Sequence, residues 1–152
     1  MPVLTRSLVS ATVLVLGVTL AVPARAADPE DMIKYRQGVM TALGGHASAM
    51  AQIVRGKVPF AGQLEGHAQS AVALTRDIPP LFPAGSDFGE TDAKPEIWKK
   101  RAEFEKAAGE TSKAADTLLA AVKGGDQAAV GKAFDGLGKT CKACHEDFRV
   151  KR

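Results

Sequence analysis

The sequence predicts an all-α fold, an antiparallel four-helix bundle, and three observations lead to it. Apolar residues recur at helical spacing along the chain after residue 26, without the sustained alternation that predicts strands. Aromatic residues are 5% of the 152 residues against 45% hydrophobic ones, so the core is expected to be aliphatic and rich in alanine. Glycines and prolines divide the pattern into four segments, joined by two short connections and one long one.

Residues 1–26 are predicted to be a secretory signal peptide. Arg6 supplies a positive start, residues 8–21 are apolar, and Ala24 and Ala26 are small residues suited to a cleavage site. The apolar stretch is shorter than the roughly 20 residues of a spanning helix, which disfavours an uncleaved anchor, and no later segment is expected to cross a bilayer. We therefore expect a periplasmic protein whose single domain is residues 27–152.

The formal charge of +3 is expected to become nearly neutral on export. Cleavage removes Arg6 and Arg25 but no acid, so the count of 20 basic residues falls to 18 against 17 acidic ones, and 18 − 17 = +1. This balance argues against a nucleic-acid binder. The length leaves no room for a two-domain or barrel enzyme, and no catalytic constellation is present, so we expect a protein that is not an enzyme.

The first helix is expected over residues 29–54, because Asp28 is a good N-cap and proline suits the first helical position, which Pro29 occupies. Its inward stripe is Arg36, Met40, Leu43, Ala47, Met50 and Val54. The second helix is expected over residues 62–77, ended by Pro79. Its stripe is Leu64, His67, Ala71, Leu74 and Ile78.

A long crossover loop without helical pattern is expected over residues 79–95, which hold four of the eight prolines. The third helix opens at Pro95, and its stripe is Ile97, Arg101, Phe104, Ala108, Thr111, Ala115, Leu118 and Val122. Gly124 and Gly125 stop this helix, and Asp126 caps the fourth. The fourth stripe is Val130, Phe134, Leu137, Cys141, Cys144 and Phe148.

The chemistry is concentrated in Cys141-Lys142-Ala143-Cys144-His145 of the last helix. Two cysteines three residues apart lie on one side of a helix, where their thiols can add to the two vinyl groups of one haem. The adjacent histidine then brings its imidazole to the iron. We predict one covalent haem c, attached through Cys141 and Cys144, with His145 as the proximal ligand.

Three alternatives use these residues without haem. A disulfide between the two cysteines would close a very small loop and add little stability. A thioredoxin-like redox pair normally opens a helix after a strand rather than lying near the end of a terminal helix. A zinc site would have to recruit His46 or His67 from other helices. A haem-free thiol or zinc-binding helical bundle therefore remains the alternative of a different class.

Three segments carry a resemblance to a known family. They are Cys141–Arg149 (CKACHEDFR), Lys34–Gln37 (KYRQ) and Lys94–Trp98 (KPEIW). In these the chain resembles the class II c-type cytochromes, that is, cytochrome c′ and its low-spin relatives of the c-556 type. The resemblance covers residues 28–152. It implies a four-helix bundle with one haem c, usually in the periplasm. It also suggests a homodimer through the first two helices, the alternative being a monomer, since the surfaces there are rich in alanine.

The family divides on the second axial position of the iron. In cytochrome c′ the matching residue of the first helix is usually a noncoordinating hydrophobe, whereas the low-spin relatives have a methionine ligand. The resemblance therefore implies that Met40 is the distal ligand of a low-spin electron carrier serving redox partner proteins. The alternatives are that Met40 is core filler and that the iron is five-coordinate, high-spin and open to NO or CO. Met32 and Met50 are weaker candidates, about 12 and 15 Å away along the axis.

Four more residues are implied to lie near the haem. The resemblance pairs Arg36 with a haem propionate, the alternative being that it snorkels to solvent. It places Gln37 and Trp98 near the haem and Arg149 on the proximal side.

His67 is interpreted as an interhelical or subunit contact. Basic residues crowd the attachment region and predict either a docking rim for an acidic redox partner or simple compensation of a helix dipole. They are Lys139, Lys142, Arg149, Lys151 and Arg152.

Overall fold

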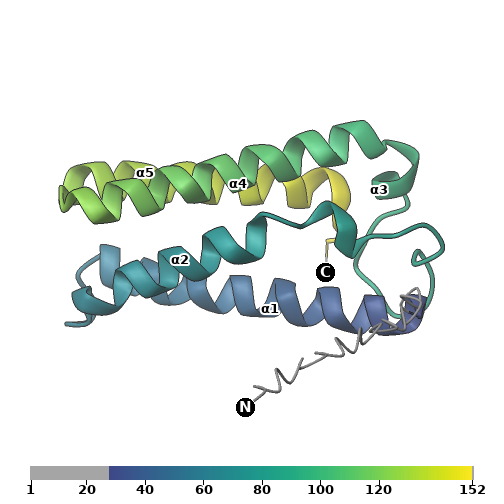
Figure 1. Ribbon diagram of the computed structural model, residues 1–152, viewed down its shortest axis with the longest axis horizontal. Helices are drawn as coiled ribbons and strands as arrows, with labels where there is room; N and C mark the ends of the chain where they lie inside the picture. Colours follow the sequence, from purple (N-terminus) through teal and green to yellow (C-terminus); the bar gives the residue numbers. More distant parts are fainter. Residues whose placement is uncertain (1–27, 152) are drawn as a thin grey trace, which may run out of the picture.

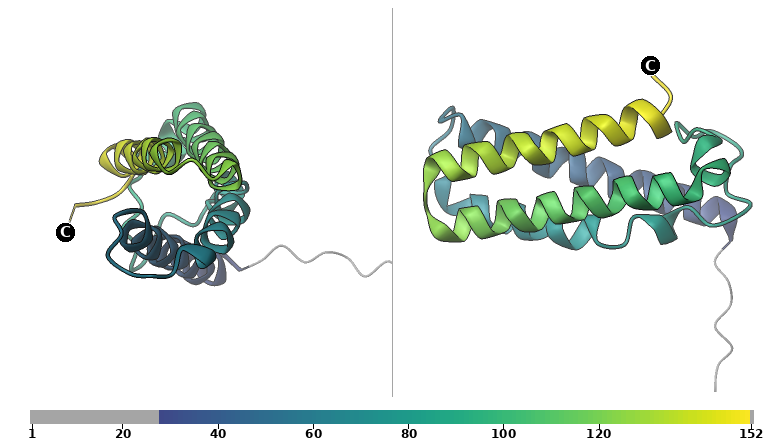
Figure 2. Two further views of the ribbon diagram at one scale, coloured as in Figure 1. Left: turned by 90° about the vertical axis from the view of Figure 1, so that its left-hand side faces the viewer. Right: turned by 90° about the horizontal axis from the view of Figure 1, so that it is seen from above.

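The long helices are arranged as two antiparallel pairs, as Figure 1 shows in this computed structural model. Residues 28–151 are described, and the predicted signal peptide lies outside them. Helix α1 (Pro29–Val54) packs on α2 (Leu64–Thr75), and α4 (Arg101–Gly124) packs on α5 (Gln127–Phe148). Seen end on in Figure 2, the four helices surround a common axis. The predicted four-helix bundle is confirmed.

Helix α1 has the predicted bounds, and local chemistry explains both ends. The Asp28 carboxylate accepts a hydrogen bond of 2.9 Å from the backbone N–H of Glu30. After the helix, Gly56 adopts the left-handed φ of 64°, which glycine tolerates without steric cost. All six residues of the predicted stripe are buried or half-buried.

Helix α2 is shorter than predicted. The 3₁₀ turn η1 (Ala61–Gln63) precedes it, and it ends at Thr75 rather than Asp77. A 3₁₀ turn differs from an α-helix by one residue in its hydrogen-bond spacing, so periodicity alone does not separate the two at a terminus.

The crossover loop is more ordered than its sequence suggested. It begins with the 3₁₀ turn η2 (Pro79–Leu81), and Ala93 forms an isolated antiparallel bridge with Arg149 after α5. The third helix, predicted to be continuous, is broken at Lys100 into α3 (Glu96–Lys99) and α4. Beside the break, the Arg101 guanidinium donates hydrogen bonds to two loop carbonyls, those of Phe82 and Pro79. Helical periodicity contains no information about such a tertiary contact.

Helix α5 carries the cysteines, and both its start and its face follow the prediction. The turn before it has Gly125 at φ 75°, and the Asp126 carboxylate accepts a hydrogen bond of 2.9 Å from the backbone N–H of Ala129. On its inward face Val130, Leu137 and Phe148 are buried.

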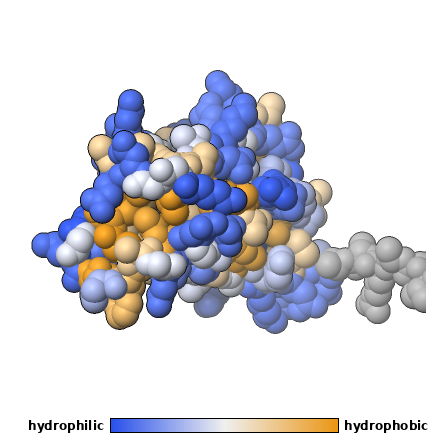
Figure 3. Space-filling view, turned by 60° about the vertical axis from the view of Figure 1, so that its left-hand side comes forward, coloured by the Kyte–Doolittle hydropathy of each residue, from blue (hydrophilic) through white to orange (hydrophobic). Residues whose placement is uncertain are grey.

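The core consists of two hydrophobic clusters along the bundle. The first contains Met50, Ala68, Ala71, Val72, Ala115, Leu118, Val130 and Leu137. The second contains Ile78, Leu81, Phe82, Ile97, Phe104, Ala108 and Phe148. Figure 3 shows a hydrophobic area framed by hydrophilic side chains on one face of the molecule. No helix among residues 28–151 combines the length and apolarity needed to cross a membrane.

Candidate functional site

The two cysteines lie where the two core clusters meet. Cys141 packs against the first cluster and Cys144 against the second. Both are half-buried free thiols, so the disulfide alternative is not what the structure contains. Their spacing of three residues on α5 places both sulfurs on the inward side of one helix.

Burial keeps both thiols in the protonated form. It raises the pKa of Cys141, and it raises the pKa of Cys144 to about 11, with Cys141 and Asp147 adding to the shift. Because thiolates are the reactive nucleophiles in disulfide exchange and metal binding, this environment opposes a thioredoxin-like role.

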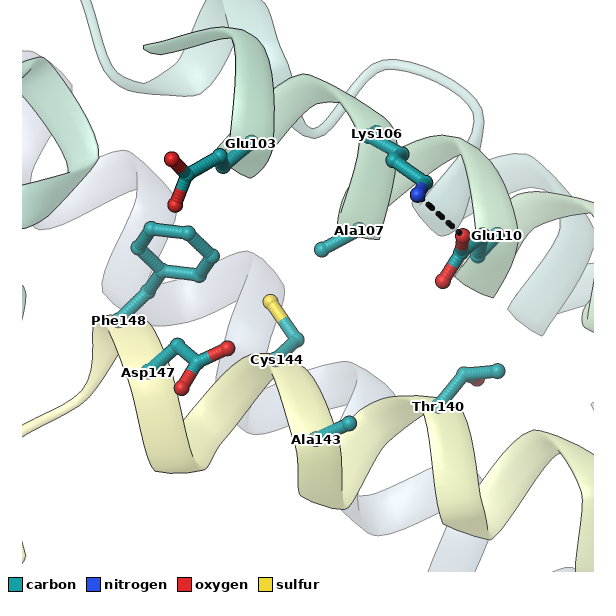
Figure 4. Close-up of a pocket in the computed structure, with 9 residues that line it drawn as sticks. All are labelled: Glu103, Lys106, Ala107, Glu110, Thr140, Ala143, Cys144, Asp147 and Phe148. Carbon is teal, nitrogen blue, oxygen red and sulfur yellow. Dashed lines mark ion pairs between the residues drawn. The ribbon is translucent and has the colours of Figure 1, made fainter. Parts of the chain in front are cut away.

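A cavity of about 270 Å³ lies beside Cys144, between α4 and α5. Figure 4 shows the Cys144 sulfur pointing from α5 towards α4, with Phe148 and Ala107 on either side. Charged side chains surround the opening, among them Lys106 and Glu110, which form an ion pair of 4.0 Å. The space next to this thiol is therefore lined by both apolar and charged side chains.

His145 lies on the outward side of α5, in a separate hollow. It is solvent-exposed, and its ring makes no hydrogen bond to any residue in the described range 28–151. Partial desolvation, and then the positive charge of Arg149, lower the pKa of its imidazole. A neutral imidazole with uncommitted nitrogens is the form that binds a metal.

Met40 lies on α1, in contact with the same cluster as Cys144. It is half-buried and packs on the second cluster, together with Trp98 and Ala93. Met50, the more distant candidate, is completely buried in the first cluster. Helices α1 and α5 pack on each other less extensively than the other adjacent long helices do.

Arg36 is buried, with 2% of its surface exposed, so the interpretation that it snorkels to solvent is wrong. Its guanidinium donates to the Ser86 hydroxyl (2.8 Å), the Ser86 carbonyl (2.9 Å) and the Thr91 hydroxyl (3.0 Å). It also lies 4.8 Å from the centre of the Phe82 ring. Burial lowers the pKa of Arg36, and Asp87 partly opposes this shift. The propionate contact stays a prediction.

The other three residues assigned to the haem surroundings also bind the crossover loop. Gln37 donates to the Glu90 carbonyl at 2.7 Å, and the Trp98 indole donates to the Pro83 carbonyl at 2.8 Å. Arg149 forms a 3.6 Å ion pair with Asp92. The sequence singled out these residues but did not indicate that one loop holds them all. That information lies in tertiary contacts, here two hydrogen bonds to backbone carbonyls and one ion pair, and residue type alone does not reveal which distant segments make them.

The zinc alternative is not supported by the arrangement. His46 and His67 contact each other between α1 and α2 and not the cysteines, which confirms an interhelical role for His67. Within residues 28–151, no group of three or more His, Cys, Asp or Glu side chains is placed to hold a metal ion.

The donor set instead fits a haem. Two free thiols one helical turn apart supply two attachment points, and the next residue supplies an uncommitted imidazole. A four-helix bundle that carries two such thiols and a histidine near the end of its last helix is a c-type cytochrome of the helical-bundle class.

Comparison with known proteins identifies the family. The family model described as Cytochrome C' matches residues 31–149, and the chain belongs to the cytochrome c′ family. It is 39% identical over 124 residues to cytochrome c′ of Pararhodospirillum photometricum, covering 81% of this chain and 99% of that protein. It is 33% identical over 121 residues to cytochrome c-556 of Agrobacterium tumefaciens (strain II Chrys), and the match covers 79% of this chain and 98% of that protein.

Solved structures agree with this assignment. The nitric oxide complex of a leucine-to-alanine mutant of cytochrome c prime from Alcaligenes xylosoxidans superposes with a TM-score of 0.77 at 33% identity. The match covers 84% of this chain and all of that one. The protein is therefore a haem-binding electron-transfer cytochrome with covalent haem c, and the haem-free alternative is set aside.

Proposed function

We propose that this protein is a periplasmic, low-spin electron carrier and not an enzyme. Its redox partners are other proteins. In this proposal Cys141 and Cys144 hold the haem through thioether bonds, His145 is the proximal ligand and Met40 is the distal ligand. The bound haem supplies a one-electron iron couple, and axial methionine ligation raises its potential.

The observation that carries the proposal is the common location of Met40 and Cys144. Both pack on the second core cluster, although they lie on α1 and α5. The thioether of Met40 is therefore available on the interior side of α5, while the His145 imidazole is on the exterior side. The looser packing of α1 on α5 favours the insertion of a flat group between them.

The chain's other residues contribute position and environment. The Arg36 guanidinium ties α1 to the crossover loop one turn before Met40 and so limits movement of that part of α1. Trp98 and Phe82 form an edge-to-face pair with centroids 6.2 Å apart, and both belong to the apolar surroundings of Met40. We further propose that Arg36 and Gln37 act near the propionates, and Arg149 on the proximal side.

Absorption spectra in both redox states test the ligand assignment. Wild-type ferric protein is expected to be low-spin with a sulfur-to-iron charge-transfer band, and ferrous protein is expected not to bind CO. Met40→Leu should produce a high-spin iron that binds CO. Met50→Leu is the matched control, because Met50 lies in the other cluster, and it should leave the spin state unchanged. An unchanged spin state in Met40→Leu would show that Met40 is not the ligand.

A second candidate function is that of a five-coordinate, high-spin cytochrome c′ that binds NO or CO. It is favoured by the similarity to the solved nitric oxide complex and by the 39% identity to a cytochrome c′. The same spectra separate the two, because a five-coordinate wild-type protein would already be high-spin and would bind CO. The homodimer through α1 and α2 remains a proposal, which sedimentation of the mature protein would test.

A further inference from the structure

His46 and His67 form a close pair that the proposed haem site does not use. His46 lies on α1 and His67 on α2, and both are half-buried. Their Nδ1 atoms are 2.9 Å apart, and the ring centroids are 5.2 Å apart at an interplanar angle of 61°. The sequence contains three histidines, and the third is His145 on α5. With His145 committed to haem iron, this pair holds the remaining imidazoles.

The separation of the two nitrogens suits two ligands of one metal ion. Metal–imidazole bonds are about 2.0 Å for zinc, so two such bonds at right angles place the nitrogens about 2.8 Å apart. A tetrahedral angle would place them about 3.3 Å apart. The observed 2.9 Å is closer to the right-angled arrangement of a tetragonal ion.

The surroundings limit the site to two protein ligands. One turn before and after each histidine the chain has Ala42, Met50, Gln63 and Ala71. No carboxylate or thiol is among them, and the described residues hold no group of three potential ligands. Water would fill the remaining positions. Among divalent first-row metals, Cu²⁺ has the highest affinity for nitrogen ligands and prefers tetragonal geometry.

We propose that His46 and His67 form a two-imidazole site that binds Cu²⁺ and links α1 to α2. In the free neutral pair, one Nδ1–H donates to the other Nδ1. Binding requires both Nδ1 lone pairs, so the proton on the donor ring moves through solvent to its own Nε2. The step forms two Cu–N bonds, displaces two waters from the ion, and involves no net proton release or change of oxidation state. This site is independent of the proposed electron-transfer function.

Calorimetric titration of CuCl₂ into untagged, haem-loaded ferric protein tests the proposal. In that protein the cysteines are thioethers and the ferric iron cannot reduce Cu²⁺. We expect one Cu²⁺ per chain, with at least tenfold weaker binding in His46→Gln and in His67→Gln. Glu65→Gln is the matched control, because Glu65 is exposed on α2 and its carboxylate accepts a hydrogen bond from the Gln69 side chain. This variant should bind Cu²⁺ as tightly as the wild type does.

Electron paramagnetic resonance of the bound ion provides the second measurement. Wild-type protein should give Cu²⁺ splitting from two nitrogens, and this splitting should be absent in either glutamine variant. Each variant is first checked by its haem spectrum and circular dichroism, and if one fails to fold the other carries the test. Binding that stays within twofold of wild type in a folded variant, or no saturable binding to wild type, would overturn the proposal.

Discussion

At the scale of single residues, Arg36 shows how a charge can be buried in this bundle mainly through hydrogen bonds to neutral groups, with Asp87 near enough to favour its charged form. Its guanidinium donates three hydrogen bonds, to Ser86 and Thr91, and lies over the Phe82 ring. A hydrogen bond to a charged group makes a net contribution of about 1.5–3 kcal/mol to stability. The arginine therefore fixes the crossover loop on α1.

Replacing Arg36 is expected to destabilise the protein. Arg36→Leu should lower the free energy of unfolding by about 2–4 kcal/mol, because the Ser86 carbonyl loses a donor in a buried place. Urea unfolding of ferric protein, followed by circular dichroism, measures the change. Lys34→Leu, on the exposed side of the same helix, is the control, and its midpoint of urea unfolding should equal that of the wild type. Equal midpoints for both variants would refute the role assigned to Arg36.

At the scale of elements, the sequence predicted the helix ends that depend on neighbouring residues but not those that depend on tertiary contacts. Asp28 and Asp126 were identified as caps from residue type, and both accept the expected hydrogen bonds. The break at Lys100 was missed, and long-range hydrogen bonds of Arg101 to loop carbonyls accompany it.

The candidate site shows the same difference between local features, which the sequence predicts, and tertiary contacts, which it does not. Cys141, Cys144 and His145 follow from spacing along one helix. That the loop contacts Arg36, Gln37, Trp98 and Arg149 follows only from the packing of distant segments. A periodicity pattern describes one helix at a time and cannot contain such contacts.

The N-cap Asp126 is expected to stabilise α5, the helix that carries the candidate site. Asp126→Ala should lower the free energy of unfolding by about 1 kcal/mol, because the N–H of Ala129 loses its acceptor. Asp135→Ala, in the exposed middle of α5, is the control and should have little effect or be slightly stabilising. Thermal unfolding of both variants compares them. Since Asp126 is near the opposite end of α5 from His145, the haem spectrum should stay unchanged.

At the scale of the whole molecule, charge is distributed unevenly despite the near-neutral total of the predicted mature chain. Lys142, Arg149 and Lys151 line the hollow that contains His145 together with one acidic residue, Glu146, and Asp92 pairs with Arg149 from the crossover loop. The side chain of Lys142 is 77% exposed. An exposed positive rim can steer an acidic partner over a distance of about 10 Å at 0.1 M salt.

Electron transfer to an acidic partner should therefore slow as ionic strength rises. We expect the second-order rate to fall by about tenfold between low and high salt, because mobile ions screen the rim. Lys142→Gln should reduce both the low-salt rate and the salt dependence. Lys123→Gln, in the last turn of α4 and so close to the start of α5 rather than to its haem-binding end, should leave both unchanged. A rate independent of salt would leave helix-dipole compensation as the explanation of these residues.

The pairing of the chain end with the crossover loop has a practical consequence for protein production. Backbone hydrogen bonds join Lys94 to Phe148 and Val150 to Asp92, and Lys151 lines the hollow that contains His145. A polyhistidine tag fused to the C-terminus would begin beside that hollow, where its imidazoles could compete as iron ligands. Such a tag would also bind copper by itself. Purification without a tag, or with one that a protease removes completely, avoids both artefacts.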